Sequence, residues 1–310
     1  PLPGEHRVAP LLDAPLARYL LEWGGTPAKD RITLRHLLTH TAGLPPFLPL
    51  WKELRGKEAY LERIVSLDLD HAPGTRTVYS DFGPILLAHV VERVSGVPFD
   101  RFVHERILQP LGLDETGFNP LDWPLGQDAA EAIKAAGTPI LARIAPTEVD
   151  TVLRMTHVHG VVHDENAWAM GGVAGHAGLF SSARDLAVFA QMMLNGGSYG
   201  GVRIVETETV RRYTARQDPR SSRALGWDTP AGRSSAGDYF SARSFGHTGF
   251  TGTSLWVDPE KDLFVVLLTN RVNPTRENTA HVALRREVHD LVQRAITDAP
   301  VAKRVDVARN

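Results

Sequence analysis

Apolar residues recur at a helical spacing in several parts of the chain. One stripe lies between Asp81 and Gly96, and its members are Leu86, Leu87, Val90, Val91 and Val94. Intervals of three and four residues are typical of a helix with one buried face, and Asp81 and Gly96 suit its two ends. The same signals predict a helix from Ser182 to Leu194 and a final helix over residues 278–296.

Two further helices are expected nearer the start of the sequence. Thr33 is well placed to cap a short apolar helix over residues 34–39, and Gly43 is placed to end it. Residues 50–66 mix charged and apolar positions in the manner of a surface helix.

The period changes towards the end of the chain. Residues 253–257 and 263–268 are apolar or β-branched, and a short polar connection separates them, which predicts an antiparallel hairpin. Helices first and strands later favour an α+β fold, with a helical lobe and an antiparallel sheet backed by helices. We expect a single domain over residues 1–310, with a mostly helical lobe (1–238), a sheet lobe with the last helix (239–297) and a tail (298–310).

Composition excludes several classes of protein. The chain has 310 residues, is 43% hydrophobic and carries a net charge of −2, which gives no reason to expect a nucleic-acid partner. It contains no cysteine, which excludes disulfides, thiol catalysis and cysteine metal sites. No apolar run is long enough to span a bilayer, and these residues contain no signal peptide. The oligomeric state stays open.

Three short stretches could carry chemistry. Tyr79-Ser80-Asp81 sets a phenol and a short polar group at one bend, although many such turns are plain helix caps. The run Gly246 to Phe250 (GHTGF) leads into a strand, and its glycines would allow close approach, although a bulged edge strand has the same pattern. Residues 32–44 are interpreted as a buried helix with a hydrogen-bonded His40.

Together and in this order, these stretches resemble the serine β-lactamase family in its broad sense. That family includes class C β-lactamases, D-alanyl-D-alanine carboxypeptidases (penicillin-binding proteins) and related esterases. The resemblance extends from about Leu12 to about Leu291. It is carried by the runs ITLRHLLTHTAGLP, YSDFGPILLAHVVERVSGVPF, GGVAGHAGLFSSARDLAVFAQMMLNGG and FGHTGFTGTSLWVDPEKDLFVVLLTNR.

The resemblance implies a β-lactamase/transpeptidase-like fold and a serine hydrolase that forms an acyl-enzyme and then hydrolyses it. The substrate would be a β-lactam, a D-alanyl peptide or an ester, that is, a small or peptidoglycan-like acyl compound. It implies no cofactor and no metal, and a periplasmic or secreted location. In this family three elements converge, namely Ser-x-x-Lys, Tyr-x-Asn and Lys-Thr-Gly.

The first of these elements is missing from the sequence. No serine among the 310 residues has a lysine three positions later. In the family the element precedes a Leu-Asp-x-Pro segment, which Leu12-Asp13-Ala14-Pro15 resembles. We therefore expect the serine upstream of Pro1, together with the N-terminal strands and the central catalytic helix. The 310 residues alone should not turn over an acyl substrate.

By the same resemblance, Tyr79 is the general acid/base that moves the proton between the serine and the leaving group. Asp81 stands where asparagine is usual and would orient the substrate or the lysine; an ionised carboxylate only accepts hydrogen bonds. His176 lies in the glycine-rich run and is expected either near the mouth of the pocket or bonded to backbone.

The strand element implies four substrate contacts. His247 and Thr248 would hydrogen-bond the substrate, Gly249 would keep the strand open, and the Phe250 N–H would be one oxyanion donor. Histidine replaces the usual lysine at position 247, and it is neutral for much of its time near pH 7. We therefore expect tolerance of esters and amides that lack a carboxylate.

Two alternatives of other classes remain open. Histidines gather over residues 157–176, namely His157, His159, His163 (followed by Asp164) and His176. A His-x-His pair could belong to a metal hydrolase, although the spacing that follows fits no zinc pattern. The chain could also be a non-catalytic member of the fold that holds peptide or peptidoglycan-like ligands. A parent sequence without an upstream Ser-x-x-Lys would favour that alternative.

Overall fold

The computed structural model describes residues 11–122, 140–298 and 301–304. Contacts divide the chain into two compact units. The helical unit is Pro1–Ile144 with His159–Phe180, and the sheet unit is Ala145–Val158 with Ser181–Asn310. This division differs from the expected lobe boundary after residue 238, because helix α10 (Ala183–Leu194) packs on the strands of the sheet unit. That the whole chain forms one domain stays a prediction.

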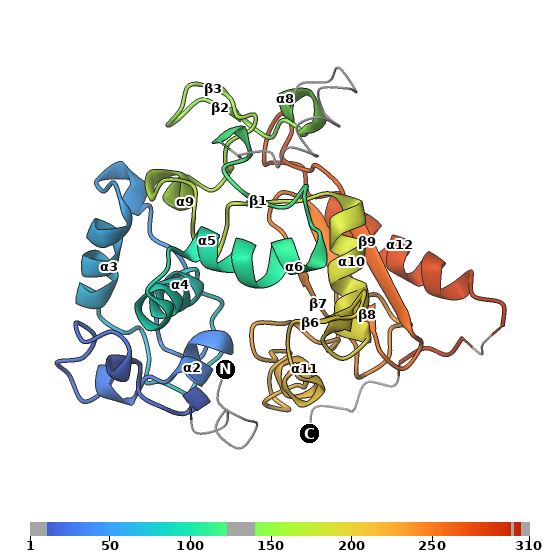
Figure 1. The fold of residues 1–310 in the computed structure, drawn as a ribbon, viewed down its shortest axis with the longest axis horizontal. Coiled ribbons are helices and arrows are strands. Elements are labelled where there is room, and N and C mark those ends of the chain that lie inside the picture. Colours follow the sequence, from blue (N-terminus) through green and yellow to red (C-terminus); the bar gives the residue numbers. More distant parts are fainter. Residues whose placement is uncertain (1–10, 123–139, 299–300, 305–310) are drawn as a thin grey trace. The chain divides into compact units, whose positions relative to one another are not determined.

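The helical unit contains short elements around one longer helix, α4 (Phe82–Ser95) (Figure 1). Its other helices are η2 (Leu16–Arg18), η3 (Lys29–Arg31), α2 (Leu34–Leu38), η4 (Leu50–Lys52), α3 (Lys57–Ser66), α5 (Phe99–Val103), the π-helix η5 (His104–Leu108), α6 (Gln109–Leu111), η6 (Pro120–Asp122), α8 (Ile140–Arg143) and α9 (Glu165–Ala169). Its strands β1 (Gly117–Phe118) and β4 (Leu179–Phe180) pair antiparallel.

The core of this unit forms where α4 meets α2. Leu86 and Val90 are buried, as the apolar stripe predicted, and Phe82 is fully buried beside them. Val94, which the stripe also included, is 67% exposed in the last turn of the helix. The two helices approach so closely that a Cβ on Gly83 would lie 3.1 Å from the carbonyl oxygen of Leu37. Gly96 ends α4 in the left-handed conformation, which confirms the predicted helix end.

Two of the shorter predicted helices have different ends. Helix α2 begins after Thr33, whose side chain accepts from the His36 N–H, but it ends at Leu38 and does not reach Gly43. His40 turns the chain instead, with a φ of 56°. The expected helix over residues 50–66 is interrupted at Gly56, whose positive φ breaks the helical path before α3.

The sheet unit is built on strands β7 (Phe245–Thr248), β8 (Thr253–Asp258) and β9 (Leu263–Leu268), in that order and antiparallel. This confirms the predicted hairpin. Helices α10 and α12 (His281–Arg294) pack on β9, and both predicted helices are present (Figure 1). The remaining elements of the unit are β2 (Val149–Asp150), β3 (Thr156–His157), β5 (Ser198–Tyr199), β6 (Val202–Arg203) and α11 (Thr207–Thr214).

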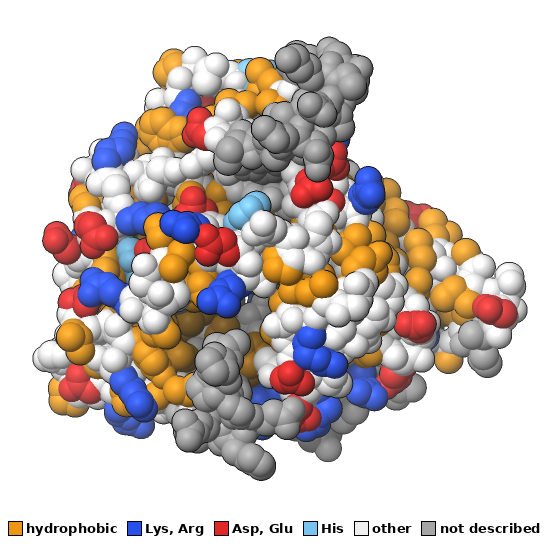
Figure 2. Space-filling model, viewed as in Figure 1, with side chains coloured by type: hydrophobic (Ala, Val, Ile, Leu, Met, Phe, Trp, Pro, Cys, Tyr) orange, Lys and Arg blue, Asp and Glu red, His pale blue; other side chains and the backbone are white. Residues whose placement is uncertain are grey.

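The architecture is therefore α+β, as the order of the sequence patterns predicted. On the face drawn in Figure 2, acidic and basic side chains are mixed, in keeping with the small net charge. Within the described part of the chain, no helix is both long and apolar enough to cross a membrane.

Candidate active site

The Tyr79-Ser80-Asp81 bend is fixed by hydrogen bonds to the segment that follows α2. The Val78 N–H donates to the His40 carbonyl at 2.8 Å, and the Asp81 N–H donates to the Pro46 carbonyl at 3.1 Å. The Ser80 hydroxyl donates to the Pro45 carbonyl at 2.6 Å. With backbone on both sides satisfied, the bend holds its side chains in fixed directions.

Tyr79 is presented to solvent on this bend. Its ring packs against His40 with the centroids 4.4 Å apart, and 43% of the residue is exposed. His40 is itself buried, and its Nδ1 accepts a hydrogen bond from the Ser80 N–H at 3.2 Å. A phenol that is packed on one side and open on the other suits proton transfer to a bound molecule. The expectation of a hydrogen-bonded His40 is confirmed.

Asp81 stands at the N-cap position of α4, but its side chain makes no capping hydrogen bond. Its backbone is already helical, with φ −69° and ψ −25°, whereas a capping residue is usually extended. The carboxylate therefore does not cap the first turn of α4. Burial raises the pKa of Asp81; the positive charge of His176 opposes this and the negative charge of Asp164 adds to it.

The glycine-rich loop that carries His176 lies directly on the first turn of α4. A Cβ on Gly175 would clash with the carbonyl oxygen of Pro84, and a Cβ on Gly178 would clash with that of Gly172. Only glycine permits these two approaches. The β1–β4 pairing then closes the loop, and His176 is placed beside Asp81.

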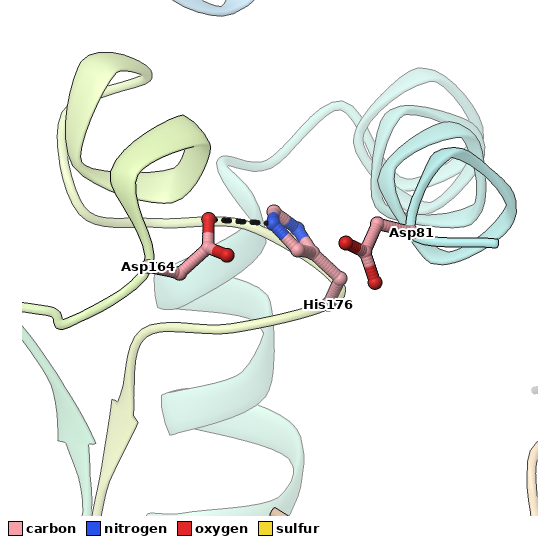
Figure 3. Close-up of side chains that lie close together, drawn as sticks. All are labelled: Asp81, Asp164 and His176. Carbon is pink, nitrogen blue, oxygen red and sulfur yellow. Dashed lines mark hydrogen bonds and ion pairs between the residues drawn. The ribbon is translucent and has the colours of Figure 1, made fainter. Parts of the chain in front are cut away.

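Asp81, Asp164 and His176 form one cluster, drawn in Figure 3. One oxygen of each carboxylate and one ring nitrogen of His176 all lie within 4.8 Å of one another. His176 Nε2 is 3.0 Å from Asp164 Oδ1, and the same oxygen accepts the Ala167 N–H at 2.7 Å as the cap of α9. His176 therefore bonds to a side chain and not to backbone, which was one of its two expected positions. The other, near the mouth of a pocket, stays a prediction.

Electrostatics distinguish the two carboxyl groups of this cluster. Burial alone would raise the pKa of Asp164, but the hydrogen bond and charge of His176 and the Ala167 N–H outweigh it, so that this pKa is lowered. Asp81 has no such donors, and its pKa is raised. Asp164 is the residue that sequence reasoning did not assign to the site, because a capping aspartate before a short helix has no distinctive pattern.

Two of the other histidines of the suspected metal stretch have separate partners. His157 bonds to the Thr147 carbonyl and to Asn273, and His159 bonds to the Ile144 carbonyl at 2.7 Å. Over the described residues, the one group of three metal-ligating side chains is Asp81, Asp164 and His176. It takes only His176 from that stretch of histidines.

In the sheet unit, β7 presents the GHTGF run at the edge of the three-stranded sheet. His247 pairs with Leu255, and Thr248 pairs with Ser254. A Cβ on Gly246 would clash with the Leu255 carbonyl oxygen, and one on Gly249 would clash with the Thr253 hydroxyl. Both glycines are thus required by close approach within the hairpin, whatever their part in binding.

His247 is held as a neutral ring. Its Nε2 lies 3.5 Å from Nη1 of Arg223, and because a guanidinium only donates, Nε2 must be the acceptor. Nδ1 then carries the proton and donates to the Thr248 carbonyl at 2.9 Å. Burial lowers the pKa of His247, and the positive charge of Arg223 lowers it further. No pattern in the sequence indicated Arg223, which lies 24 positions from His247.

Phe250 lies in the tight turn between β7 and β8. More than half of it is exposed, and the guanidinium of Arg271 covers its ring, 4.1 Å from the centroid. Arg271 Nε also donates to the Phe250 carbonyl at 2.8 Å. The turn is therefore fixed from the side of the ring and from its carbonyl. The oxyanion role of the Phe250 N–H stays a prediction.

The structure thus brings Asp81 and His176 together in the helical unit, where Tyr79 lies on the same bend as Asp81. The other four, His247 to Phe250, lie together in the sheet unit. The meeting of the two groups in one cleft stays a prediction, and so do their catalytic roles.

A family model described as Beta-lactamase matches residues 11–290. The chain belongs to the Beta-lactamase family. It is 37% identical over 265 residues to a Salmonella typhi protein named "Putative D-alanyl-D-alanine carboxypeptidase", a match that covers 78% of this chain and 58% of the relative. The chain thus spans less than two thirds of the length of such curated relatives.

Solved structures show the same fold at low identity. A penicillin-binding protein homologue from Caulobacter crescentus has a TM-score of 0.63 and 18% identity, with 92% of this chain and 77% of that chain covered. A class C β-lactamase has a TM-score of 0.63 and 14% identity, with 93% and 76% covered. The β-lactamase/transpeptidase-like fold that the sequence runs indicated is confirmed.

Proposed function

We propose that the protein is a serine hydrolase that forms an acyl-enzyme with a D-alanyl peptide and releases the terminal residue. The observation that carries this proposal is the Tyr79 phenol, packed on His40, fixed by the bend and open on its outer side. Membership of the Beta-lactamase family and the names of its relatives support the reaction class. Hydrolysis at a peptidoglycan-like substrate would place the protein in the periplasm or outside the cell.

The proposed nucleophile is the serine of a Ser-x-x-Lys element outside these 310 residues, since none of their serines has a lysine three positions later. The serine oxygen attacks the substrate carbonyl, and its proton passes through Tyr79 to the leaving amine. Water then attacks the ester, and the serine regains its proton by the reverse route. The 310 residues alone would form no acyl-enzyme.

Arg223 supports a substrate that ends in a carboxylate. The expected tolerance of uncharged esters rested on the loss of a permanent positive charge at position 247 and on the repulsion of an anionic substrate by an ionised Asp81. The guanidinium of Arg223, 3.5 Å from His247 Nε2, supplies a permanent positive charge next to the strand. We therefore propose that Arg223 contacts the terminal carboxylate of the peptide, and that the neutral His247 ring accepts from the guanidinium and orients it.

Covalent labelling tests the proposal. The 310-residue chain and a protein extended to include a Ser-x-x-Lys element would both be treated with a fluorophosphonate probe and with a fluorescent penicillin. We expect labelling of the extended protein alone, and release of D-alanine from a D-alanyl-D-alanine peptide. An extended protein that binds the peptide but takes no label would instead identify a non-catalytic ligand-binding member of the family.

A further inference from the structure

The carboxylate of Asp81 is largely buried, and no neighbouring group that the structure describes donates a hydrogen bond to it. Among the described residues, its carboxylate has no hydrogen-bond or ion-pair partner, although its backbone groups are bonded to Pro46 and Ile85. Asp164, a neighbouring acid that is also partly buried, accepts hydrogen bonds from two donors. A desolvated carboxylate with no donor is costly, which indicates that a positive group belongs beside it.

His176 supplies a second, independent sign of a ligand. Its side chain is only 2% exposed, and within the described part of the chain its buried Nδ1 has no hydrogen-bond partner. The Asp164 carboxylate only accepts, so Nε2 is the donor of their bond, and in the neutral form of the ring Nδ1 carries a lone pair. Figure 3 shows the imidazole between the two carboxylate groups. The buried Nδ1 of the neutral ring would therefore accept a hydrogen bond from a donor on a ligand.

We propose that Asp81, Asp164 and His176 bind a protonated primary amine on the acyl substrate. This deepens the proposed function and rests on it only for the statement that the amine belongs to the substrate. An ammonium group has three N–H donors, and the cluster offers one acceptor from each of its three side chains.

The separation between Asp81 and His176 fits an ammonium group that lies between them. Acceptors about 2.8 Å from an ammonium nitrogen lie about 4.6 Å apart, because the N–H bonds diverge tetrahedrally. Neighbouring ligands of a metal with bonds of about 2.1 Å lie only about 3.0–3.4 Å apart. An oxygen of Asp81 is within 4.8 Å of a ring nitrogen of His176, yet the two share no hydrogen bond or ion pair. One ammonium group could bridge this gap, with one N–H donating to Asp81 and another to His176.

The first experiment measures binding without catalysis. The 310-residue chain is titrated with ethylammonium chloride at constant ionic strength, and the His176 Cε1–H resonance is followed by NMR. Tetramethylammonium chloride serves as the control ligand, because it has the same charge but no N–H donor. We expect a saturable shift with ethylammonium, and binding at least tenfold weaker with tetramethylammonium. Equal responses to the two ions, or no saturation, would overturn the proposal.

Variants then locate the site. Asp81→Asn and Asp164→Asn should each weaken ethylammonium binding at least tenfold, and asparagine still serves as a cap in place of Asp164. Asp68→Asn, which removes an exposed carboxylate of the same unit, should leave binding unchanged. Dialysis against manganese(II) or zinc(II) followed by metal analysis adds a further readout. A stoichiometric ion that is lost in Asp81→Asn would assign the cluster to a metal and overturn the proposal.

A kinetic experiment on the extended protein separates this inference from the proposed function. D-Alanine p-nitroanilide carries the amine, and the matched propionyl p-nitroanilide lacks it. We expect a kcat/KM at least tenfold higher for the amine, with the preference removed by Asp164→Asn mainly through KM. Equal hydrolysis of both would refute the amine site and leave the serine hydrolase standing. Hydrolysis of neither would refute the proposed function, and the NMR titration would then decide the amine site alone.

Discussion

The candidate residues of the helical unit and those of the sheet unit differ in the charge that they present. In the helical unit, Asp81, Asp164 and His176 offer hydrogen-bond acceptors, and one of the two carboxylates has no donor among the described residues. In the sheet unit, a guanidinium donates to a histidine that is held neutral. Both sets of residues depart from the family pattern, aspartate for asparagine and histidine for lysine, but only the first departure changes the charge presented.

This difference shows that a substitution in a motif must be judged with its neighbours in space. At position 247 the lost positive charge of lysine is replaced by Arg223, so that the strand keeps a cation beside it. At position 81 the new negative charge has no compensating donor among the residues described, and Asp164 adds to it.

The largest effect is expected for Tyr79→Phe in the extended protein. The ring should keep its packing on His40, but the proton route is lost, so kcat for D-alanyl peptide hydrolysis should fall roughly 100- to 10,000-fold. Tyr199→Phe, which alters an exposed tyrosine of the sheet unit, should leave kcat unchanged. Steady-state kinetics and acyl-enzyme trapping measure both. Near-normal acylation by Tyr79→Phe would remove the phenol from the mechanism.

Arg223→Gln tests the sheet-unit side. A charged hydrogen bond to a carboxylate is worth about 1.5–3 kcal/mol, so kcat/KM for the peptide acid should fall roughly tenfold to a hundredfold. The matched methyl ester should lose little, because it carries no negative charge. Arg220→Gln, in an exposed ion pair with Asp218, is the control. Equal losses for acid and ester would mean that Arg223 serves the strand alone.

Stability should also depend on pH, through histidines that are kept neutral in both units. Burial lowers the pKa of His89 in the helical unit and of His247 and His289 in the sheet unit. Below about pH 6.5 these histidines bind protons in the unfolded chain but stay neutral in the folded chain. The free energy of unfolding should therefore fall as pH falls, by up to roughly 1.4 kcal/mol per pH unit for each such histidine.

Chemical denaturation between pH 7.5 and 5.5 measures this slope. His289→Gln should reduce it, since His289 is fully buried and its Nδ1 pairs with the Ser235 carbonyl at 2.8 Å. His104→Gln, at an exposed position of the π-helix, should leave the slope as it is. A slope that His289→Gln does not change would show that other groups cause the acid sensitivity.

The sequence predicted the features that depend on neighbours along the chain. The caps Thr33 and Ser182 accept from backbone N–H groups three residues on, and Gly96 ends α4, because these devices are local. The hairpin followed from two runs of apolar or β-branched residues joined by a short polar connection. The runs that resemble the family also located Tyr79 and His247, although no local rule distinguishes either from an ordinary surface residue.

Contacts between distant parts of the chain could not be predicted in this way. The Asp164–His176 bond depends on glycine approaches that pack one loop against α4, and the Arg223–His247 contact spans 24 positions. Asp81 also illustrates the limit of a local rule. Its type and position predict a capping side chain, but its helical backbone directs the carboxylate towards Asp164 and His176.

The smallest expected effect concerns the stability of the acidic part itself. The pKa of Asp81 is raised by burial, so the ionised form is disfavoured by folding, and the group costs stability above its unfolded pKa of about 3.8.

Asp81→Asn keeps the shape and removes the charge. We expect its thermal midpoint at pH 7 to rise by about 2–4 °C, the shift that ~1 kcal/mol gives in a domain of this size. The gain should shrink as pH falls towards 3.8 and vanish well below it, where the carboxyl is protonated in both states, and Asp68→Asn should show no gain at either pH. A midpoint that falls at pH 7 would mean that the carboxylate already has a donor in solution. A rise accompanied by weaker amine binding would show that stability is given up at this position in exchange for recognition.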